Sequence, residues 1–489
     1  MTAIAPPMPA VPAVVTTPTA RSRTSRAIAS GAVLFAVAYL TMPFTEATGG
    51  RGPLAVTKAA VVVVVALAAV KPWRELRSSV LALAVAVGLA ALVVCLLTTP
   101  GWFGATRAAS YGLGAGAFVA VAAYARNVRQ MTHVALVVVA AGVMQFAWAF
   151  VPWQGGRVQS KAMVGTFYWH NQYGAFLLAP TLIGLCLLVG NRAPWRLAGW
   201  VVVPLGTAGV VYSSSRGAMA TLAVGWLIVG VLAVASRKRL AATVRWLAAA
   251  AIALGATFVI AGPPFFATSA SPLAATQARE KSGESVDANS EYRMHMWRES
   301  VSVFEHHPLA GVGYGGLVPA AVQVTPADWP RSPLSHNDYL QALAEGGLLL
   351  GLPFLIACGA IATRLLRVSF VSVRRRSVDV RTGMCVGALA LMAHAAIDFD
   401  WTYPALFALT AILAGAVVGP TLRRPALQHA RSTTRLMVRV AAVCVLVGVV
   451  IVGGVAGRKG GNRLAFHFGD TGQQSSPLAA GPAAGQQPQ

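Results

Sequence analysis

The stretch RSPLSHNDYLQALAEGGLLLG, residues 331–351, places ionisable side chains at the start of an apolar segment. Ser335 or Asn337 can cap a helix there, so His336 is expected at or just before its N-terminus. A histidine that titrates near neutral pH can take a proton from an attacking hydroxyl. A polar stripe is costly inside a bilayer, so one at the mouth of an apolar helix indicates function, although His336 can also simply solvate the helix end. The stripe, at spacing i, i+3 and i+7, consists of Asp338, Gln341 and Glu345.

Three arginines can bind an anionic substrate beside this histidine. Arg216 lies in YSSSRGA, a very short turn at the start of an apolar segment, where a helix N-terminus also favours an anion. Arg293 and Arg298 lie in a long polar connection. Guanidinium binds phosphate oxygens in pairs and stays charged, so arginines with one histidine base suit displacement of a lipid-linked diphosphate. The alternatives are that Arg216 closes its turn or reaches to water, and that the other two form a solvated helix face.

Two further segments bring polar groups to the ends of apolar stretches, GTFYWHNQYG (165–174) and HAAIDFDWTYP (394–404). In the second, His394 and Asp398 stand at i and i+4, so Asp398 can orient His394, pair with an arginine or cap a helix. Tryptophans in these segments and in the loop, Trp169, Trp297 and Trp401, can stack on sugar rings or mark the membrane interface. The candidates for a shared substrate-binding pocket with His336, Asp338 and Glu345 are His170, Asn171, Gln172, His394, Asp398, Asp400 and Trp401.

Composition places these groups in a membrane protein. Of the 489 residues, 56% are hydrophobic and 11% are charged, and the mean hydropathy is +0.63, which excludes a soluble domain. The net charge of +24 comes from arginines between apolar segments, so it indicates membrane topology and not a nucleic-acid partner. The five cysteines lie inside apolar runs without CxxC spacing, and no zinc motif is present. We therefore expect no metal site and no cofactor.

Thirteen apolar segments are candidate membrane helices, several near the minimum of ~17 residues. We expect an all-α polytopic protein with a disordered cytoplasmic N-terminus (1–26), helices one to nine (27–262), a large extracytoplasmic loop (263–336), helices ten to thirteen (337–456) and a disordered tail (457–489). The first segment can alternatively be a signal peptide, and the last can be absent or interfacial. The segments are 27–44, 54–70, 78–98, 108–125, 132–151, 172–190, 197–213, 217–236, 243–262, 338–363, 382–398, 402–420 and 438–456.

Charge predicts the orientation of this topology. When the connections are numbered alternately, one set contains most of the 39 Lys and Arg residues, and the other set contains fewer although it includes the longest loop. The positive-inside rule makes the first set cytoplasmic, which puts the N-terminus inside the cell and the long loop outside. The protein is therefore expected in the cytoplasmic membrane, with its polar clusters on the extracytoplasmic face.

The long loop is expected to be partly helical. SEYRMHMWRESVSVFEHHPL is typical of an amphipathic helix that Ser290 can cap, with Tyr292, Met296, Trp297, Val301 and Phe304 on the apolar face. GVGYGG then predicts a tight turn. Beyond the loop, Gly347 and Gly351 stand at the GxxxG spacing of closely packed helices.

Several of these motifs together resemble the O-antigen ligase/polymerase superfamily of membrane glycosyltransferases. They are SSSRGA, the long loop, HPLAGVGYGG, SHNDYLQALAEGG and HAAIDFDW, and the resemblance covers roughly residues 165–420. It implies about a dozen helices and transfer of a glycan from an undecaprenyl-diphosphate carrier, without a nucleotide sugar and, in the ligases, without a required metal. The thirteenth segment and the long tail depart from the commonest twelve-helix pattern.

The resemblance also implies roles for individual residues. The functional residues of the ligases are an arginine in the short SRG turn, an arginine in the loop and a histidine near the loop's end, which match Arg216, Arg293 and His336. Arg298 is a rival for the second position, and Asp338 or another carboxylate can orient the histidine. The partners implied are the lipid-linked glycan donor, a glycan, lipid or protein acceptor, and the bilayer. A polymerase of the same superfamily is the close alternative, and a lipid-linked glycan transporter or flippase is the alternative from another class.

Overall fold

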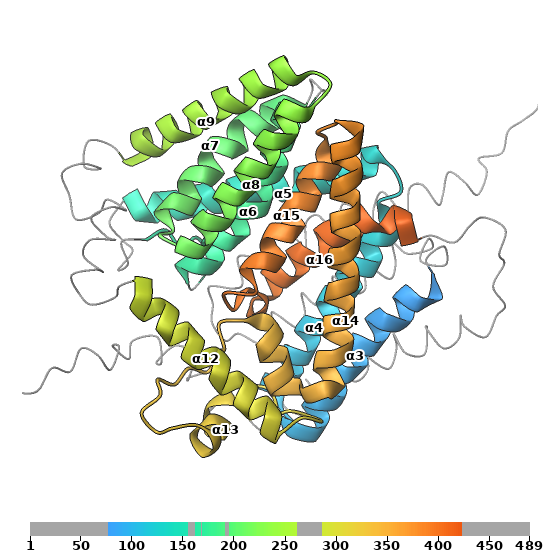
Figure 1. Cartoon of the computed structure of the whole chain (residues 1–489), viewed down its shortest axis with the longest axis vertical. Coiled ribbons are helices and arrows are strands. Elements are labelled where there is room, and N and C mark those ends of the chain that lie inside the picture. Colours follow the sequence, from blue (N-terminus) through green and yellow to red (C-terminus); the bar gives the residue numbers. More distant parts are fainter. Residues whose placement is uncertain (1–76, 155–161, 168, 191–194, 262–285, 423–489) are drawn as a thin grey trace, which may run out of the picture.

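The computed structural model describes residues 77–154, 162–167, 169–190, 195–261 and 286–422, and every regular element within these ranges is helical (Figure 1). The predicted all-α class is confirmed. The helices are α3 (Ser78–Thr98), α4 (Trp102–Tyr124), α5 (Val128–Gln154), α6 (His170–Val189), α7 (Arg196–Tyr212), α8 (Arg216–Ala235), α9 (Arg239–Ala261), α12 (Val286–His306), α13 (Leu317–Val324), α14 (Asp338–Arg375), α15 (Val380–His394) and α16 (Pro404–Val418), with 3-10 turns η4 (Asp400–Thr402) and η5 (Gly419–Leu422).

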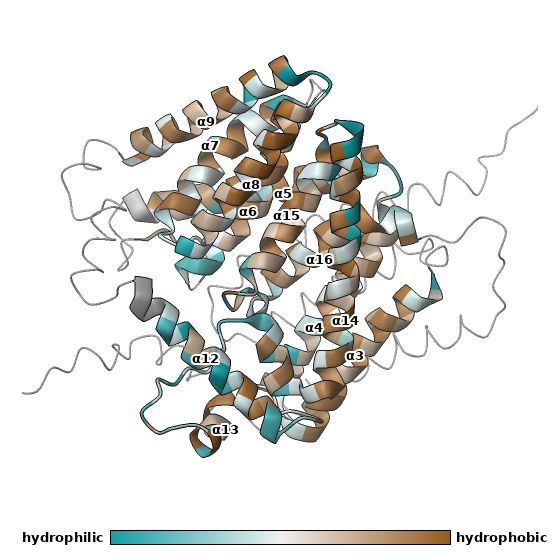
Figure 2. Ribbon diagram, in the orientation of Figure 1, coloured by the Kyte–Doolittle hydropathy of each residue, from teal (hydrophilic) through white to brown (hydrophobic). Residues whose placement is uncertain are grey.

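The chain is a multi-pass membrane protein. Within the described residues, seven helices are long and apolar enough to cross a bilayer, and α7 and α15 are shorter apolar helices. Figure 2 shows apolar residues along the bundle and hydrophilic ones at its ends and on α12. Ten of the thirteen predicted segments correspond to helices here. The other three, 27–44, 54–70 and 438–456, lie outside the described residues.

Helix α6 forms the centre of one half of the bundle. Every residue from Gln172 to Val189 is buried, and α6 packs against α5, α7, α8, α9 and α15. Small residues allow the close approach: Gly184 lies against Val202 of α7, and Gly383 of α15 lies against the backbone of Ile183. The polar residues at the start of α6 are therefore carried by a helix that is held on all sides.

Connections rich in arginine lie together at one end of the bundle. The backbone N–H of Arg237, after α8, donates to the carbonyl of Arg376, after α14, at 3.1 Å. The guanidinium of Arg245 donates to the carbonyl of Gly190 at 2.7 Å, and that of Arg381 to Val417 at 3.2 Å. The starts of α8 and α14 lie at the opposite end, and there the polar clusters gather (Figures 1 and 2).

Helix α14 is broken at Gly347, where φ is 56° and ψ is −156°. The segment after α12 fills the break, because Leu348 and Leu349 donate backbone hydrogen bonds to Pro308 and Leu309. In return, the backbone N–H groups of the GVGYGG turn donate to carbonyls of α14, from Val312 to Ala344 at 3.0 Å and from Gly313 to Glu345 at 2.9 Å.

This break corrects the GxxxG prediction. A Cβ at Gly347 would lie 2.5 Å from backbone atoms of Leu309 and Gly311, so the glycine admits the loop and not a second membrane helix. The predicted tight turn at GVGYGG is present, and three of its glycines, Gly311, Gly313 and Gly315, have positive φ.

The loop helix also differs from its prediction in two details. Helix α12 begins at Val286, so Ser290 lies within it and does not cap it. Val301 is 40% exposed, whereas Met296 and Val303 are buried. The buried face is thus rotated from the predicted one, and it includes a carboxylate, Glu299.

We expect Gly347→Ala to destabilise the protein by about 1–3 kcal/mol, because its φ and ψ are accessible essentially only to glycine and the methyl group would meet backbone. Thermal unfolding in detergent measures the effect. Gly359→Ala on the same helix is the matched control, since a Cβ there has no neighbour within 4 Å. Equal melting temperatures for the two variants would contradict the role of the break.

Candidate functional site

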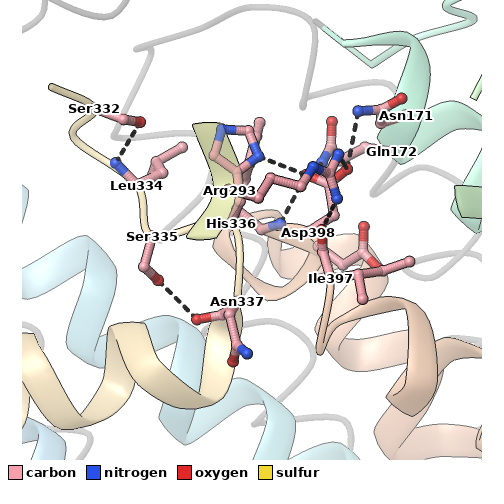
Figure 3. A network of polar contacts seen from close by, with 12 residues as sticks. Asn171, Gln172, Arg293, Ser332, Leu334, Ser335, His336, Asn337, Ile397 and Asp398 are labelled. Atoms are coloured by element: carbon pink, nitrogen blue, oxygen red, sulfur yellow. Dashed lines mark hydrogen bonds and ion pairs between the residues drawn. The ribbon is translucent and has the colours of Figure 1, made fainter. Parts of the chain in front are cut away.

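The site is built around the carboxylate of Asp398, which is 1% exposed (Figure 3). Asn171 Nδ2 donates to Oδ2 at 2.9 Å, and Gln172 Nε2 donates to Oδ1 at 3.4 Å. The guanidinium of Arg293 lies 3.3 Å from Oδ2, and Nδ1 of His336 lies 3.4 Å from Oδ1. The carboxylate thus joins α6, α12, the segment before α14 and the turn after α15.

The turn 394–401, between α15 and α16, presents this carboxylate. It is closed by its own backbone, since Ile397 N donates to the carbonyl of His394 at 2.9 Å. It is also tied to α14, because Asp338 N donates to the carbonyl of Ala395 at 2.9 Å. Arg293 donates a second hydrogen bond, to the carbonyl of Ile397, so its guanidinium binds both the backbone of the turn and the carboxylate.

His336 is held in a left-handed backbone conformation, with φ of 50°. Trp297 Nε1 donates to its carbonyl at 3.2 Å, and its ring meets the edges of Phe399 and Tyr292, with ring centroids 4.8 and 6.0 Å away. Asn337 follows as the helix cap, because its side chain accepts from the backbone N–H groups of Tyr339 and Leu340. A strained backbone at a histidine that faces a carboxylate is typical of a functional site.

Arg216 is the first residue of α8 and follows a second strained residue, Ser214, with φ of 55°. Ser215 caps the helix, since its hydroxyl accepts from Ala218 N at 3.3 Å. Gly217 lies against the turn that carries Asp398: a Cβ there would be 3.1 Å from the Ile397 side chain. The Arg216 turn and the Asp398 turn are therefore neighbours.

The electrostatics of the cluster keep Asp398 ionised. Burial alone would raise the pKa of this carboxyl, but His336 and Arg293 outweigh burial and hold the pKa below its ordinary value. An ionised Asp398 in turn favours an N–H on Nδ1 of His336, which leaves Nε2 as the basic nitrogen.

A comparison with protein families found a match for part of this region. The family model described as O-antigen ligase (Wzy_C) matches residues 201–355, from within α7 to within α14. Residues 201–355, about a third of the 489 residues, therefore match an O-antigen ligase domain. A search of curated proteins gave no match. The matched residues include Arg216, Arg293 and His336, whereas Asp398 lies beyond them.

Three residues that were predicted to bind substrate make contacts within the protein: Asp338, Glu345 and Trp401. Asp338 accepts a hydrogen bond from Trp401 N at 2.8 Å, and the carboxylate that lies beside Nδ1 of His336 is that of Asp398. Glu345 accepts from Gly315 N at 2.9 Å and from Gln341 at 2.7 Å, and so holds the GVGYGG turn. Trp401 is 7% exposed and packs on Tyr339, Phe354 and Phe407.

The remaining candidates are spread along α6 and α12. His170 is half-buried at the start of α6, one residue before Asn171. Arg298 is exposed on α12, whereas Arg293 contacts the cluster. Asp398 pairs with an arginine, and His394 pairs with Asp400 instead, with Nδ1 and Oδ2 2.7 Å apart. Of the three alternatives for Asp398, the pairing with an arginine is therefore the one observed.

Sequence reasoning missed two ion pairs near the site. Arg107 of α4 lies 3.9 Å from Glu345, and Arg331 lies 3.5 Å from Glu299 of α12. A signal for the second was available, because an acidic residue fell on the apolar side of an amphipathic helix. Within the described residues, no three His, Cys, Asp or Glu side chains are grouped as metal ligands.

Glu299 predicts a pH dependence of the loop. Burial raises its pKa to about 7, against the opposing effect of Arg331. The folded protein therefore keeps a proton that the unfolded chain releases, so this group lowers stability as pH rises from its ordinary pKa towards 7. We expect Glu299→Gln to gain stability relative to wild type, by up to about 1.4 kcal/mol per pH unit across that window.

Thermal unfolding at pH 5 and pH 8 measures this difference. Glu305→Gln, an exposed position on the same helix, serves as the control. A Glu299→Gln variant whose stability differs from wild type by the same amount at both pH values would contradict the titration of Glu299 in this range.

Proposed function

We propose that the protein transfers a glycan from an undecaprenyl-diphosphate carrier to an acceptor hydroxyl on the extracytoplasmic face of the cytoplasmic membrane. The observation that carries the proposal is the cluster of Arg293, Asp398 and His336 beside the Arg216 turn. It combines a base, a carboxylate that orients the base, and fixed cations, at one end of a membrane bundle. The match to the O-antigen ligase family supports the same chemistry.

His336 is the proposed general base. Asp398 lies 3.4 Å from its Nδ1, so the imidazole presents Nε2 to the acceptor hydroxyl. Nε2 takes the hydroxyl proton while the oxygen attacks the anomeric carbon of the donor sugar. The new glycosidic bond forms as the bond to the diphosphate oxygen breaks, and undecaprenyl diphosphate leaves. A single displacement of this kind inverts the configuration at the anomeric carbon.

Arg216 and Arg293 are the proposed ligands of the diphosphate. A guanidinium offers paired N–H donors to phosphate oxygens and remains charged at every relevant pH. Arg216 adds the N-terminus of α8, where the helix dipole also favours negative charge. Both cations stabilise the charge that develops on the leaving diphosphate, which is where electrostatic catalysis acts most strongly.

The orientation follows from the distribution of charge. Arg237, Arg245, Arg376 and Arg381 lie at the end of the bundle opposite the Arg216 and His336 segments. By the positive-inside rule the arginine-rich end is cytoplasmic, so the cluster faces outward, where lipid-linked glycans are assembled into surface polysaccharide.

The acceptor decides between two forms of the reaction. A second lipid-linked glycan would make the protein a polymerase, and a different molecule would make it a ligase. A transporter would need ionisable groups at mid-membrane and paired broken helices. The cluster is instead formed by helix ends and by α12, which favours transfer over transport.

We expect His336→Ala and Arg216→Ala each to abolish glycan transfer, because the first removes the base and the second removes a ligand of the leaving group. Purified protein with lipid-linked oligosaccharide as donor and cell-envelope extract as acceptor gives the rate, followed as release of undecaprenyl diphosphate. Both variants should retain wild-type membrane insertion and melting temperature. Full activity in either one would refute its role.

A second prediction separates the two loop arginines. Arg293→Lys should lower kcat by about 100-fold, because an ammonium cannot reproduce the paired contacts to Asp398 and to the Ile397 carbonyl. Arg298→Lys, a matched change on the exposed side of α12, should stay within about twofold of wild type. The reverse pattern in the same assay would make Arg298 the diphosphate ligand.

A further inference from the structure

A buried histidine–carboxylate pair lies beside the site and takes no part in the mechanism above. His394 ends α15 and Asp400 begins η4, and both residues have 0% exposure. Nδ1 of His394 lies 2.7 Å from Oδ2 of Asp400, which brings the two ends of the turn together. Nε2 of His394 has no hydrogen-bond partner among the described residues. Leaving a buried ring nitrogen unsatisfied costs free energy, so its retention needs a reason.

The unsatisfied edge of the imidazole rests against Gly217. A Cβ at Gly217 would lie 3.0 Å from Nε2 and 3.4 Å from Cδ2 of His394. Gly217 does not have a positive φ, so its backbone does not require glycine. Alanine is the better helix former at such a position. The glycine is therefore explained by the close approach of the imidazole and of the Ile397 side chain, and not by the local conformation.

This contact joins the two halves of the site. Gly217 follows Arg216 on α8, and His394 lies on the same closed turn as Asp398, with Ile397 N bonded to the carbonyl of His394 at 2.9 Å. A shift of α8 against the turn would change the separation of the diphosphate ligand from the carboxylate that orients the base. The ring edge of His394 meets Gly217, together with the side chain of Ile397 on the same turn.

We infer that His394, braced by Asp400, is a positioning residue that sets the distance between Arg216 and Asp398 through its contact with Gly217. The inference rests on the proposed function, because it assigns the contact to the alignment of leaving group and base. Asn171 and Gln172, at the start of α6, hold Asp398 from the other side.

Gly217→Ala tests this directly. The added methyl group must push the imidazole or α8 by a few tenths of an ångström, and we expect kcat to fall about tenfold while the KM for the donor changes little. The melting temperature should equal or exceed that of wild type, because alanine favours the helix. Gly359→Ala, where a Cβ has no neighbour within 4 Å, is the control and should keep wild-type kcat.

A second variant makes the test specific to the contact. His394→Asn keeps an amide near the position of Nδ1, where it can still donate to Asp400, but removes the ring edge. The single variant His394→Asn should also lower kcat, because the imidazole no longer sets the distance between Arg216 and Asp398. In the Gly217→Ala background it makes room for the methyl group, so the double variant should be more active than Gly217→Ala. If the two substitutions acted independently, their effects on kcat would instead multiply in the double variant.

The assay uses full-length protein in detergent, an undecaprenyl-diphosphate-linked oligosaccharide and cell-envelope extract. Wild-type kcat in Gly217→Ala or in His394→Asn would overturn the positioning role, and so would a double variant no more active than Gly217→Ala. Absence of transfer by the wild-type protein would reject the proposed function itself. An active wild type with an equally active Gly217→Ala would reject only the positioning role.

Discussion

The site depends on one buried charge. Asp398 is 1% exposed, and an unpaired carboxylate in such a place would cost several kcal/mol, so it requires partners. Those partners come from separate parts of the chain: Asn171 and Gln172 from α6, Arg293 from α12 and His336 from the segment before α14. The need to satisfy this carboxylate therefore gathers the loop helix and the start of α14 against the membrane bundle.

The contacts of Asp398 with Arg293 and His336 also determine which parts of these two side chains remain exposed. Arg293 contacts the turn 394–401 at two points, the Asp398 carboxylate and the Ile397 carbonyl, and is 21% exposed in its side chain. It therefore keeps an exposed side while it remains anchored. His336 is 19% exposed and keeps Nδ1 towards the carboxylate, so its other nitrogen points away from it. One buried anion thus orients an imidazole and retains a guanidinium.

Local features of this arrangement could be predicted from sequence, and pairings across long distances could not. The cap at Asn337, the helix start at Arg216 and the tight turn at GVGYGG follow from residue types at short spacing. The choice of Asp398 over Asp338 as the partner of His336 depends on how α14 and α15 pack, which no local pattern contains. The i, i+4 spacing suggested a pair of His394 with Asp398, but α15 ends at His394, so the helical spacing no longer applies beyond it.

The break in α14 shows why the connection from α12 to α14 and the site cannot be understood separately. Gly347 was expected in a helix–helix contact, but it ends a regular turn whose backbone groups are satisfied by Pro308, Leu309, Val312 and Gly313. Because α14 starts two residues after His336, this docking holds one end of the first turns of the helix while the contact of His336 with Asp398 holds the other. Left-handed conformations at Ser214 and His336 are maintained only where surrounding contacts exceed their cost. The hydrogen bond from Trp297 of α12 to the His336 carbonyl is one of those contacts, so the geometry of the cluster depends on α12 and the bundle together.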